Sequence, residues 1–146
     1  LADIQLSEDA PAERQVFSAL LHQADHLRRL YQRSQQRAPI AVLLSDRVLR
    51  RPLLTLGAIL GRAKAGEGAG ASARRLDRLQ VIVDQRTNRH RRGMLLGEHV
   101  GIYSVAEVFE HTDAMRWMKR LMHHAQRIEF YNDMVATALR TGSAPD

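Results

Sequence analysis

The chain has 146 residues and a formal net charge of +6, and 45% of its residues are hydrophobic. This length suits one domain with a sizeable core, and the scarcity of aromatic residues beside abundant Leu and Ala favours helix. Cys is absent, which excludes a disulfide framework, a thiolate zinc site and a Cys nucleophile. The excess of Arg predicts a surface that attracts phosphate, nucleic acid or an anionic membrane.

The hydropathy pattern and the opening segment bear on whether the chain spans a membrane and whether it belongs to a longer protein. The longest nearly apolar run, Leu53 to Leu60, is far shorter than the ~20 residues that span a bilayer. The chain starts at Leu1 rather than Met, and the stretch to Pro11 is acidic and lacks the features of a signal peptide. We therefore expect the chain to be a piece of a longer protein.

The first strong helical pattern runs from about Pro11 to about Arg37, where Ala38-Pro39 ends it. One apolar row at steps of three and four predicts the seam that faces a partner helix. That row consists of Phe17, Leu20, Ala24, Leu27, Tyr31 and Ser34. A polar stripe lies between the seam positions and is expected to face outward. It consists of His22, Asp25, His26, Arg29 and Arg33.

The middle of the chain is helical but interrupted. From Ile40 to Lys64 the pattern predicts a helix with a kink or break near Arg50 and Arg51, because Pro52 lacks a backbone donor and clashes with the preceding turn. The Gly-rich stretch 66–72 predicts a flexible connection.

A further helix is expected from about Ser72 to Arg92, with Gly93 stopping it and a loop from Met94 to Tyr103. Its end is rich in cations, which complement the dipole of a last helical turn. These cations are Arg86, Arg89, His90, Arg91 and Arg92. Ser104 and Glu107 then form a capping-box pattern that predicts a short helix from Val105 to Glu110.

The last and longest helical pattern runs from Thr112, a potential cap, to Leu139. Its expected seam contains Ala114, Met118, Leu121, Ala125, Ile128, Asn132, Val135 and Leu139. Other large side chains at helical spacing are interpreted as core residues rather than as a ligand box. They are Trp117, Tyr131, Met115, Met122 and Met134. The whole pattern predicts an all-α antiparallel bundle of about four main helices, with the second kinked and a short helix before the last.

Two stretches resemble a known family. The segment 21–30, LHQADHLRRL, resembles the H-x-x-D-H-L-x-R-L stretch of the soluble PhoU-like C-terminal domain of bacterial sodium/phosphate cotransporter family proteins. The segment 113–128, DAMRWMKRLMHHAQRI, is similar to the family's D-A-x-R-W-L-x-R-x-x-x-H-x-x-R-I run, with Met118 in place of Leu. The resemblance covers both ends of the chain, and the middle only by helical pattern.

The resemblance implies a single PhoU-like bundle domain over residues 1–146, on the cytoplasmic face of the bacterial inner membrane. It implies a regulatory or accessory role for a sodium-dependent phosphate transporter rather than an enzymatic one. The partner would be the protein's own transmembrane domain, with phosphate or the anionic membrane surface as further ligands. PhoU proteins hold metal clusters with repeated acidic E/D-x-x-x-D motifs, whereas this chain has that spacing only once, from Glu129 to Asp133, so the resemblance does not imply a metal cluster.

The sequence leaves two chemical interpretations of these residues open. His22, Asp25 and His26 have the spacing for a divalent metal site if His124 or His123 completes it, although such His residues also serve as hydrogen-bond partners between helices. Alternatively, the guanidinium groups of Arg side chains on both terminal helices bind an anion, or they form an interhelical network whose charge Asp25 and Glu129 partly neutralise. The expected docking or anion-binding surface consists of His22, Asp25, His26, Arg29, Arg33, Arg116, Arg120, His123, His124 and Arg127.

A different function class is also compatible with the composition. A free-standing basic helical domain could bind nucleic acid through the run Arg86 to Arg92, although that run lacks the interleaved aromatic residues of many such sites. The sequence identifies neither the effector nor the oligomeric state, and a homo-oligomer remains an open alternative. No nucleophile-and-base pair or Gly-rich phosphate loop is evident, so we expect neither catalysis nor a cofactor beyond the metal considered above.

Overall fold

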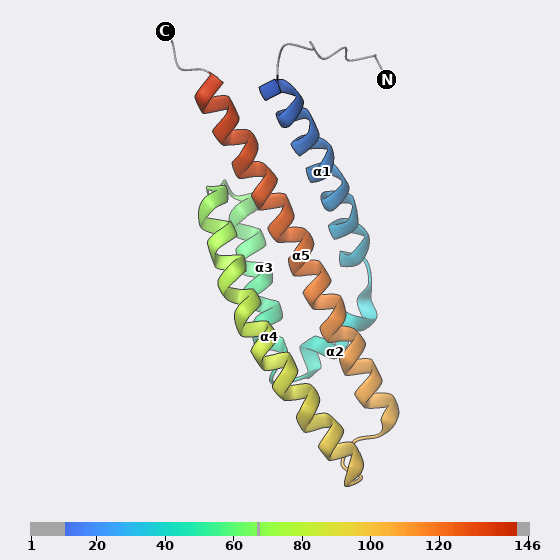
Figure 1. Cartoon of the computed structure of the whole chain (residues 1–146). Coiled ribbons are helices and arrows are strands. Elements are labelled where there is room, and N and C mark those ends of the chain that lie inside the picture. The colour runs from blue at the N-terminus through green and yellow to red at the C-terminus, as the bar shows by residue number, and fades with distance from the viewer. Residues whose placement is uncertain (1–10, 67, 143–146) are drawn as a thin grey trace.

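The computed structural model describes residues 11–66 and 68–142, so the opening segment 1–10 lies outside the described residues. The described residues form an all-α bundle, as predicted, with five helices rather than about four (Figure 1). They are α1 (Pro11–Ser34), α2 (Arg37–Ser45), α3 (Arg50–Lys64), α4 (Ala69–His99) and α5 (Val105–Gly142).

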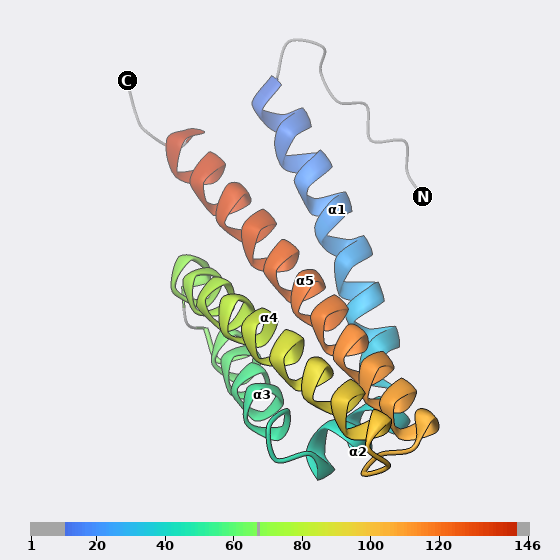
Figure 2. The same cartoon turned by 60° about the horizontal axis from the view of Figure 1, so that its bottom comes forward.

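Helix α5 is the central element of the bundle. Helix α1 runs antiparallel along one side of it and α4 runs antiparallel along another, while α2 crosses near the N-terminal half of α5 (Figures 1 and 2). Helix α3 packs mainly on α4. Because neighbours surround α5 on several sides, more than one of its faces is buried.

The core lies where α2, α3, α4 and α5 meet. Leu43, Leu56, Leu76 and Met118 are fully or almost fully buried there, one from each helix. The expected seam of α5 is confirmed from Ala114 to Ile128, while Asn132 and Leu139 near the far end of α5 are exposed. The interpretation of large side chains as core is confirmed for four of them, and the fifth, Met134, is half-buried. The four buried residues are Trp117, Tyr131, Met115 and Met122.

The orientation of α1 differs from the expected one. Leu20, Leu27 and Tyr31 of the predicted seam are 45%, 48% and 67% exposed, whereas Ala19, in a neighbouring row, is only 2% exposed. Consecutive side chains on a helix point about 100° apart around its axis. The apolar row and the polar row of α1 therefore lie side by side, and either could face α5. The polar row meets α5 because α5 presents polar partners to it, such as Asn132, whose Oδ1 accepts a hydrogen bond from Gln23 Nε2 (2.9 Å).

The expected interruption near Arg50 and Arg51 is confirmed, as a break between two helices rather than a kink. Helix α3 begins at Arg50, which places Pro52 in its first turn, where a missing N–H removes no helical hydrogen bond. Asp46 stabilises the break, since its Oδ1 accepts hydrogen bonds from the backbone N–H groups of Val48 (2.7 Å) and Leu49 (3.0 Å).

The expected end of α4 at Gly93 is wrong, because α4 continues to His99. Gly93 is exposed and permits the helix to continue, and the next residue, Met94, is buried and extends its packing face. The packing at the end of α4 requires a glycine at Gly97 instead, because a Cβ there would come within 2.5 Å of the Tyr103 ring. The chain therefore turns closely back over Gly97 before α5 begins. At its other end α4 starts at Ala69, so the connection before it is shorter than expected, and Glu67 lies outside the described residues.

The capping box at the start of α5 is confirmed. Glu107 Oε2 accepts from the backbone N–H of Ser104 (2.7 Å), and Ser104 Oγ accepts from the backbone N–H of Glu107 (3.2 Å). The expected division into a short and a long helix is wrong, because no Gly or Pro interrupts the helix and Thr112 lies buried inside it rather than capping it. The result is one long helix that places widely spaced polar residues on a continuous surface.

Candidate functional site

The two stretches that carry the family resemblance pack against each other across the α1–α5 interface. His26 Nδ1 lies 3.0 Å from His124 Nδ1, although 98 residues separate them in the sequence. The His22 ring stacks on the ring of Tyr131, with centroids 5.4 Å apart. The structure thus brings together side chains that the sequence placed on separate helices.

On α5, Arg and His side chains continue this surface along the exposed side of the helix. Arg116, Arg120 and His123 are exposed and Arg127 is half-buried, at the steps of four and three that keep residues on one helical face. Together with the α1 stripe they form what we call the basic face. It consists of His22, Asp25, His26, Arg29 and Arg33 from α1, and Arg116, Arg120, His123, His124 and Arg127 from α5.

The stripe of α1 lies at the edge of the interface rather than wholly outward as expected. Arg29 keeps an exposed side chain, whereas His26 and Arg33 are half-buried. Trp117 Nε1 donates a hydrogen bond to the backbone carbonyl of Arg33 (3.2 Å), which fixes the end of α1 against α5. The basic face is therefore attached to the bundle, with Arg29, Arg116 and Arg120 exposed to solvent and His124 buried beneath them.

Carboxylates neutralise part of this charge. Asp25 accepts hydrogen bonds from Arg29 Nε (2.7 Å) and from Arg28 (3.2 Å), and the bond from Arg29 is the main cause of the lowered pKa of its carboxyl group. On α5, Asp113 pairs with Arg116 at 3.3 Å. Glu129 is buried, which raises its pKa.

The two facing histidines are held in their neutral form. Burial lowers the pKa of His26, and electrostatic interactions with His123 and Arg127 lower it further. Burial also lowers the pKa of His124 to about 4, with Arg33 as the next contributor. Near neutral pH one Nδ1 carries the hydrogen and donates it to the other, since two protonated rings would repel each other at 3.0 Å.

Arg127 has a defined position on the basic face. Its guanidinium donates to the hydroxyl of Tyr131 and lies 4.6 Å from the ring centroid of Phe130 and 4.7 Å from that of Tyr131. These cation–π contacts stabilise the side chain in one orientation. An Arg held in this way loses less side-chain entropy when it binds an anion.

The potential metal ligands His22, Asp25, His26 and His124 occupy different environments. Asp25 binds two Arg side chains, His22 stacks on Tyr131, and only His26 and His124 face each other directly. Within residues 11–66 and 68–142, no group of three or more His, Asp or Glu is arranged to hold a metal ion. The guanidinium groups of the basic face have the chemistry to bind anions.

At one end of the basic face lies an open cavity of about 710 Å³, where α1, α2 and α5 meet. Three Arg side chains line it, namely Arg33, Arg116 and Arg120. Trp117 and residues at the start of α2 supply an apolar wall. The sequence predicted the Arg cluster but missed the wall from α2, because α2 was expected to belong to one longer helix.

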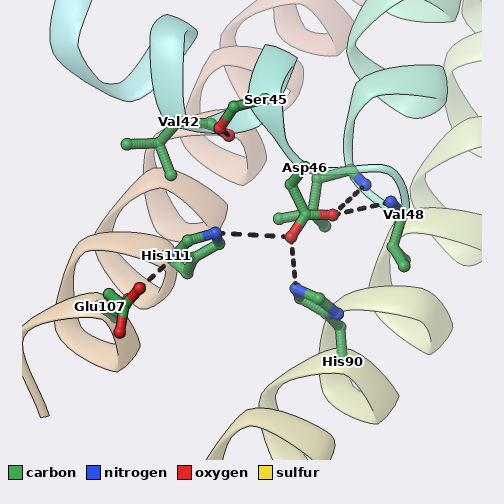
Figure 3. Close-up of polar contacts among 8 residues, drawn as sticks. Val42, Ser45, Asp46, Val48, His90, Glu107 and His111 are labelled. Carbon is green, nitrogen blue, oxygen red and sulfur yellow. Dashed lines mark hydrogen bonds and ion pairs between the residues drawn. The ribbon is translucent and has the colours of Figure 1, made fainter. Parts of the chain in front are cut away.

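A second polar cluster, made of residues that do not belong to the basic face, was also missed (Figure 3). Asp46 Oδ2 is 2.8 Å from His90 Nε2 and 3.5 Å from His111 Nε2, so one carboxylate contacts two imidazole rings. The His90 contact lies off the hydrogen-bond direction, and Nδ1 of His111 is bonded to the carbonyl of Glu107 (2.9 Å). The cluster joins the α2–α3 break to α4 and α5. No local spacing signals it, since the three residues come from distant segments.

Comparisons with known proteins add no assignment. A scan against models of known protein families, a search of curated proteins and a search of solved structures each return no match. Among the helices of the described residues, none combines the length and the apolar character needed to cross a membrane.

Proposed function

We propose that this chain is an accessory domain that regulates a membrane-embedded phosphate transporter, and that it acts through the basic face. The proposal rests on the resemblance of segments 21–30 and 113–128 to the PhoU-like domain of sodium/phosphate cotransporter proteins. The observation that carries it is the packing of these two segments into one surface that combines His26 and His124 with exposed Arg side chains.

The chemistry of the basic face suits reversible docking rather than catalysis. Arg29, Arg116 and Arg120 expose guanidinium groups that can form bidentate hydrogen bonds with carboxylates or phosphates. Cationic surfaces of this kind accelerate association and set the orientation of a partner more than they set raw affinity. The partner is an anionic surface on the transporter's membrane part, with phosphate as a competing ligand.

Charge reversal tests the docking. We expect Arg29→Glu with Arg120→Glu, introduced into the full-length parent protein, to change the rate of phosphate uptake several-fold, because like charges then face each other across the docking surface. Both side chains are exposed, so the helical content of the domain should stay the same. The measurement is uptake of labelled phosphate by cells that express equal amounts of each variant.

The matched control reverses two exposed cations of α3, Arg62→Glu with Lys64→Glu, which lie outside the basic face. Uptake in this control should equal that of the natural protein. Equal uptake in the natural protein and in the Arg29/Arg120 variant, with both folded and present at equal levels, would contradict the proposed docking.

A further inference from the structure

The cavity where α1, α2 and α5 meet has the dimensions of a small-molecule site. Its volume of about 710 Å³ falls within the range of roughly 300–1,000 Å³ that is typical of pockets for organic ligands. Inorganic phosphate alone would fill only a small part of that space. The cavity therefore fits a ligand with a body as well as a charged group.

The lining divides the cavity into a cationic part and an apolar part. Arg33, Arg116 and Arg120 supply guanidinium groups from two helices. Pro39, Val42 and Trp117 supply the apolar part, and Trp117 is buried, so its ring is held in place by the bundle. A planar or apolar group can lie against this wall while an anionic group reaches the Arg side chains.

One donor in this cluster has no partner. Arg33 Nε is buried and forms no hydrogen bond, although the carbonyl of the same residue accepts from Trp117. Leaving a buried charged donor unsatisfied is unfavourable, and such groups commonly mark a site that a ligand completes. Because Nε is covered in this structure, an oxygen of a bound phosphate would supply the missing acceptor once the Arg33 side chain turns toward the cavity.

The two carboxylates at the cavity suit a ligand that also carries hydroxyl groups. Glu110 and Asp113 are both exposed, and Asp113 already pairs with Arg116. Glu110 can accept a hydrogen bond from a sugar hydroxyl at the mouth of the cavity. These carboxylates also disfavour ligands that carry a high negative charge along their whole length.

We propose that this cavity binds a phosphomonoester attached to a planar organic body, of the size and chemistry of a nucleoside monophosphate. The phosphate binds Arg33, Arg116 and Arg120, and the planar group lies against Trp117 and Pro39. Binding of such a ligand goes beyond the docking proposed above and does not depend on it, because it is a property of the isolated chain.

The chain itself supplies the reporter, since Trp117 is its only Trp. Titration of the 146-residue chain with adenosine monophosphate should change Trp fluorescence in a saturable way, and calorimetry should give the same Kd. Inorganic phosphate and adenosine, which each offer half of the interactions, should bind at least about tenfold more weakly. Binding of phosphate as tightly as the nucleotide, or no saturable binding of the nucleotide by either method, would overturn the proposal.

A pair of variants localises the site. Arg120→Gln should raise the Kd for the nucleotide about tenfold or more, because it removes a charge-assisted hydrogen bond from an exposed position that is not needed for folding. Arg62→Gln, on the exposed side of α3, should leave the Kd unchanged. Equal Kd values for Arg120→Gln and the natural chain would place the ligand elsewhere and overturn the assignment. Because the docking experiment measures uptake in the parent protein, either proposal can fail while the other holds.

Discussion

Acidification from pH 7 to pH 4 should lower the free energy of unfolding by up to about 3 kcal/mol through His124 alone. The unfolded chain binds a proton at this residue with a pKa near 6.5, whereas burial and Arg33 lower the pKa in the folded chain to about 4. Between these values the unfolded chain holds more protons. The stabilisation is therefore complete above pH 6.5 and is lost as the pH falls toward 4.

Other groups with shifted pKa values also contribute to the pH dependence of the free energy of unfolding. His26 acts in the same direction, since burial lowers its pKa too. Glu129 acts in the opposite direction, because a raised carboxyl pKa adds stability at low pH. The pKa of Asp25 is lowered from 3.8, so its contribution to the free energy of unfolding is lost only at pH values below the range from pH 7 to pH 4.

Urea unfolding at pH 7 and at pH 4 separates these contributions when it is repeated on His124→Gln. The difference in the free energy of unfolding between the two pH values should shrink in this variant by most of the His124 contribution. The control His99→Gln, at the exposed end of α4, should keep the full difference. An equal pH dependence for His124→Gln and the natural chain would show that this histidine is not buried as described.

Truncation of Met118 should be among the most damaging single changes to the fold. Its side chain is 0% exposed and lies in the core cluster with Leu43, Leu56 and Leu76. Met118→Ala removes buried apolar atoms and leaves a cavity, with an expected cost of about 2–5 kcal/mol. The measurement is the free energy of unfolding in urea at pH 7.

Leu139→Ala is the matched control on the same helix. Leu139 is 60% exposed although it belongs to the same predicted seam, so its truncation should cost less than about 0.5 kcal/mol. Similar costs for both variants would mean that the core does not lie where α5 crosses α2, α3 and α4.

Sequence patterns predicted the fold well where packing and local chemistry agree. The seam of α5 from Ala114 to Ile128 is buried because partners line that whole length, and the Ser104–Glu107 cap depends on residues three apart. Helix ends were less predictable. Gly93 does not end α4, since an exposed glycine weakens a helix without stopping it when Met94 continues the packed face.

The candidate site was predictable in its residue types and less so in its geometry. Helical spacing placed the cations of the basic face on common stripes, but periodicity alone could not decide which row of α1 would meet α5. The choice follows from the partners that α5 offers, such as His124 for His26 and Asn132 for Gln23. The Asp46 cluster and the wall of the cavity depend on contacts between distant segments, which no local pattern contains.

The most direct test of this arrangement uses the single indole N–H of the chain, which gives one resolved signal in a ¹⁵N-labelled spectrum. Trp117 Nε1 donates to the carbonyl of Arg33 across the α1–α5 interface. We therefore predict slow hydrogen exchange of the indole N–H and a nuclear Overhauser effect to the backbone of residues 33 and 34. Rapid exchange, with contacts to Leu20 or Leu27 in place of residue 33, would show that α1 packs through its apolar row and that the basic face does not exist.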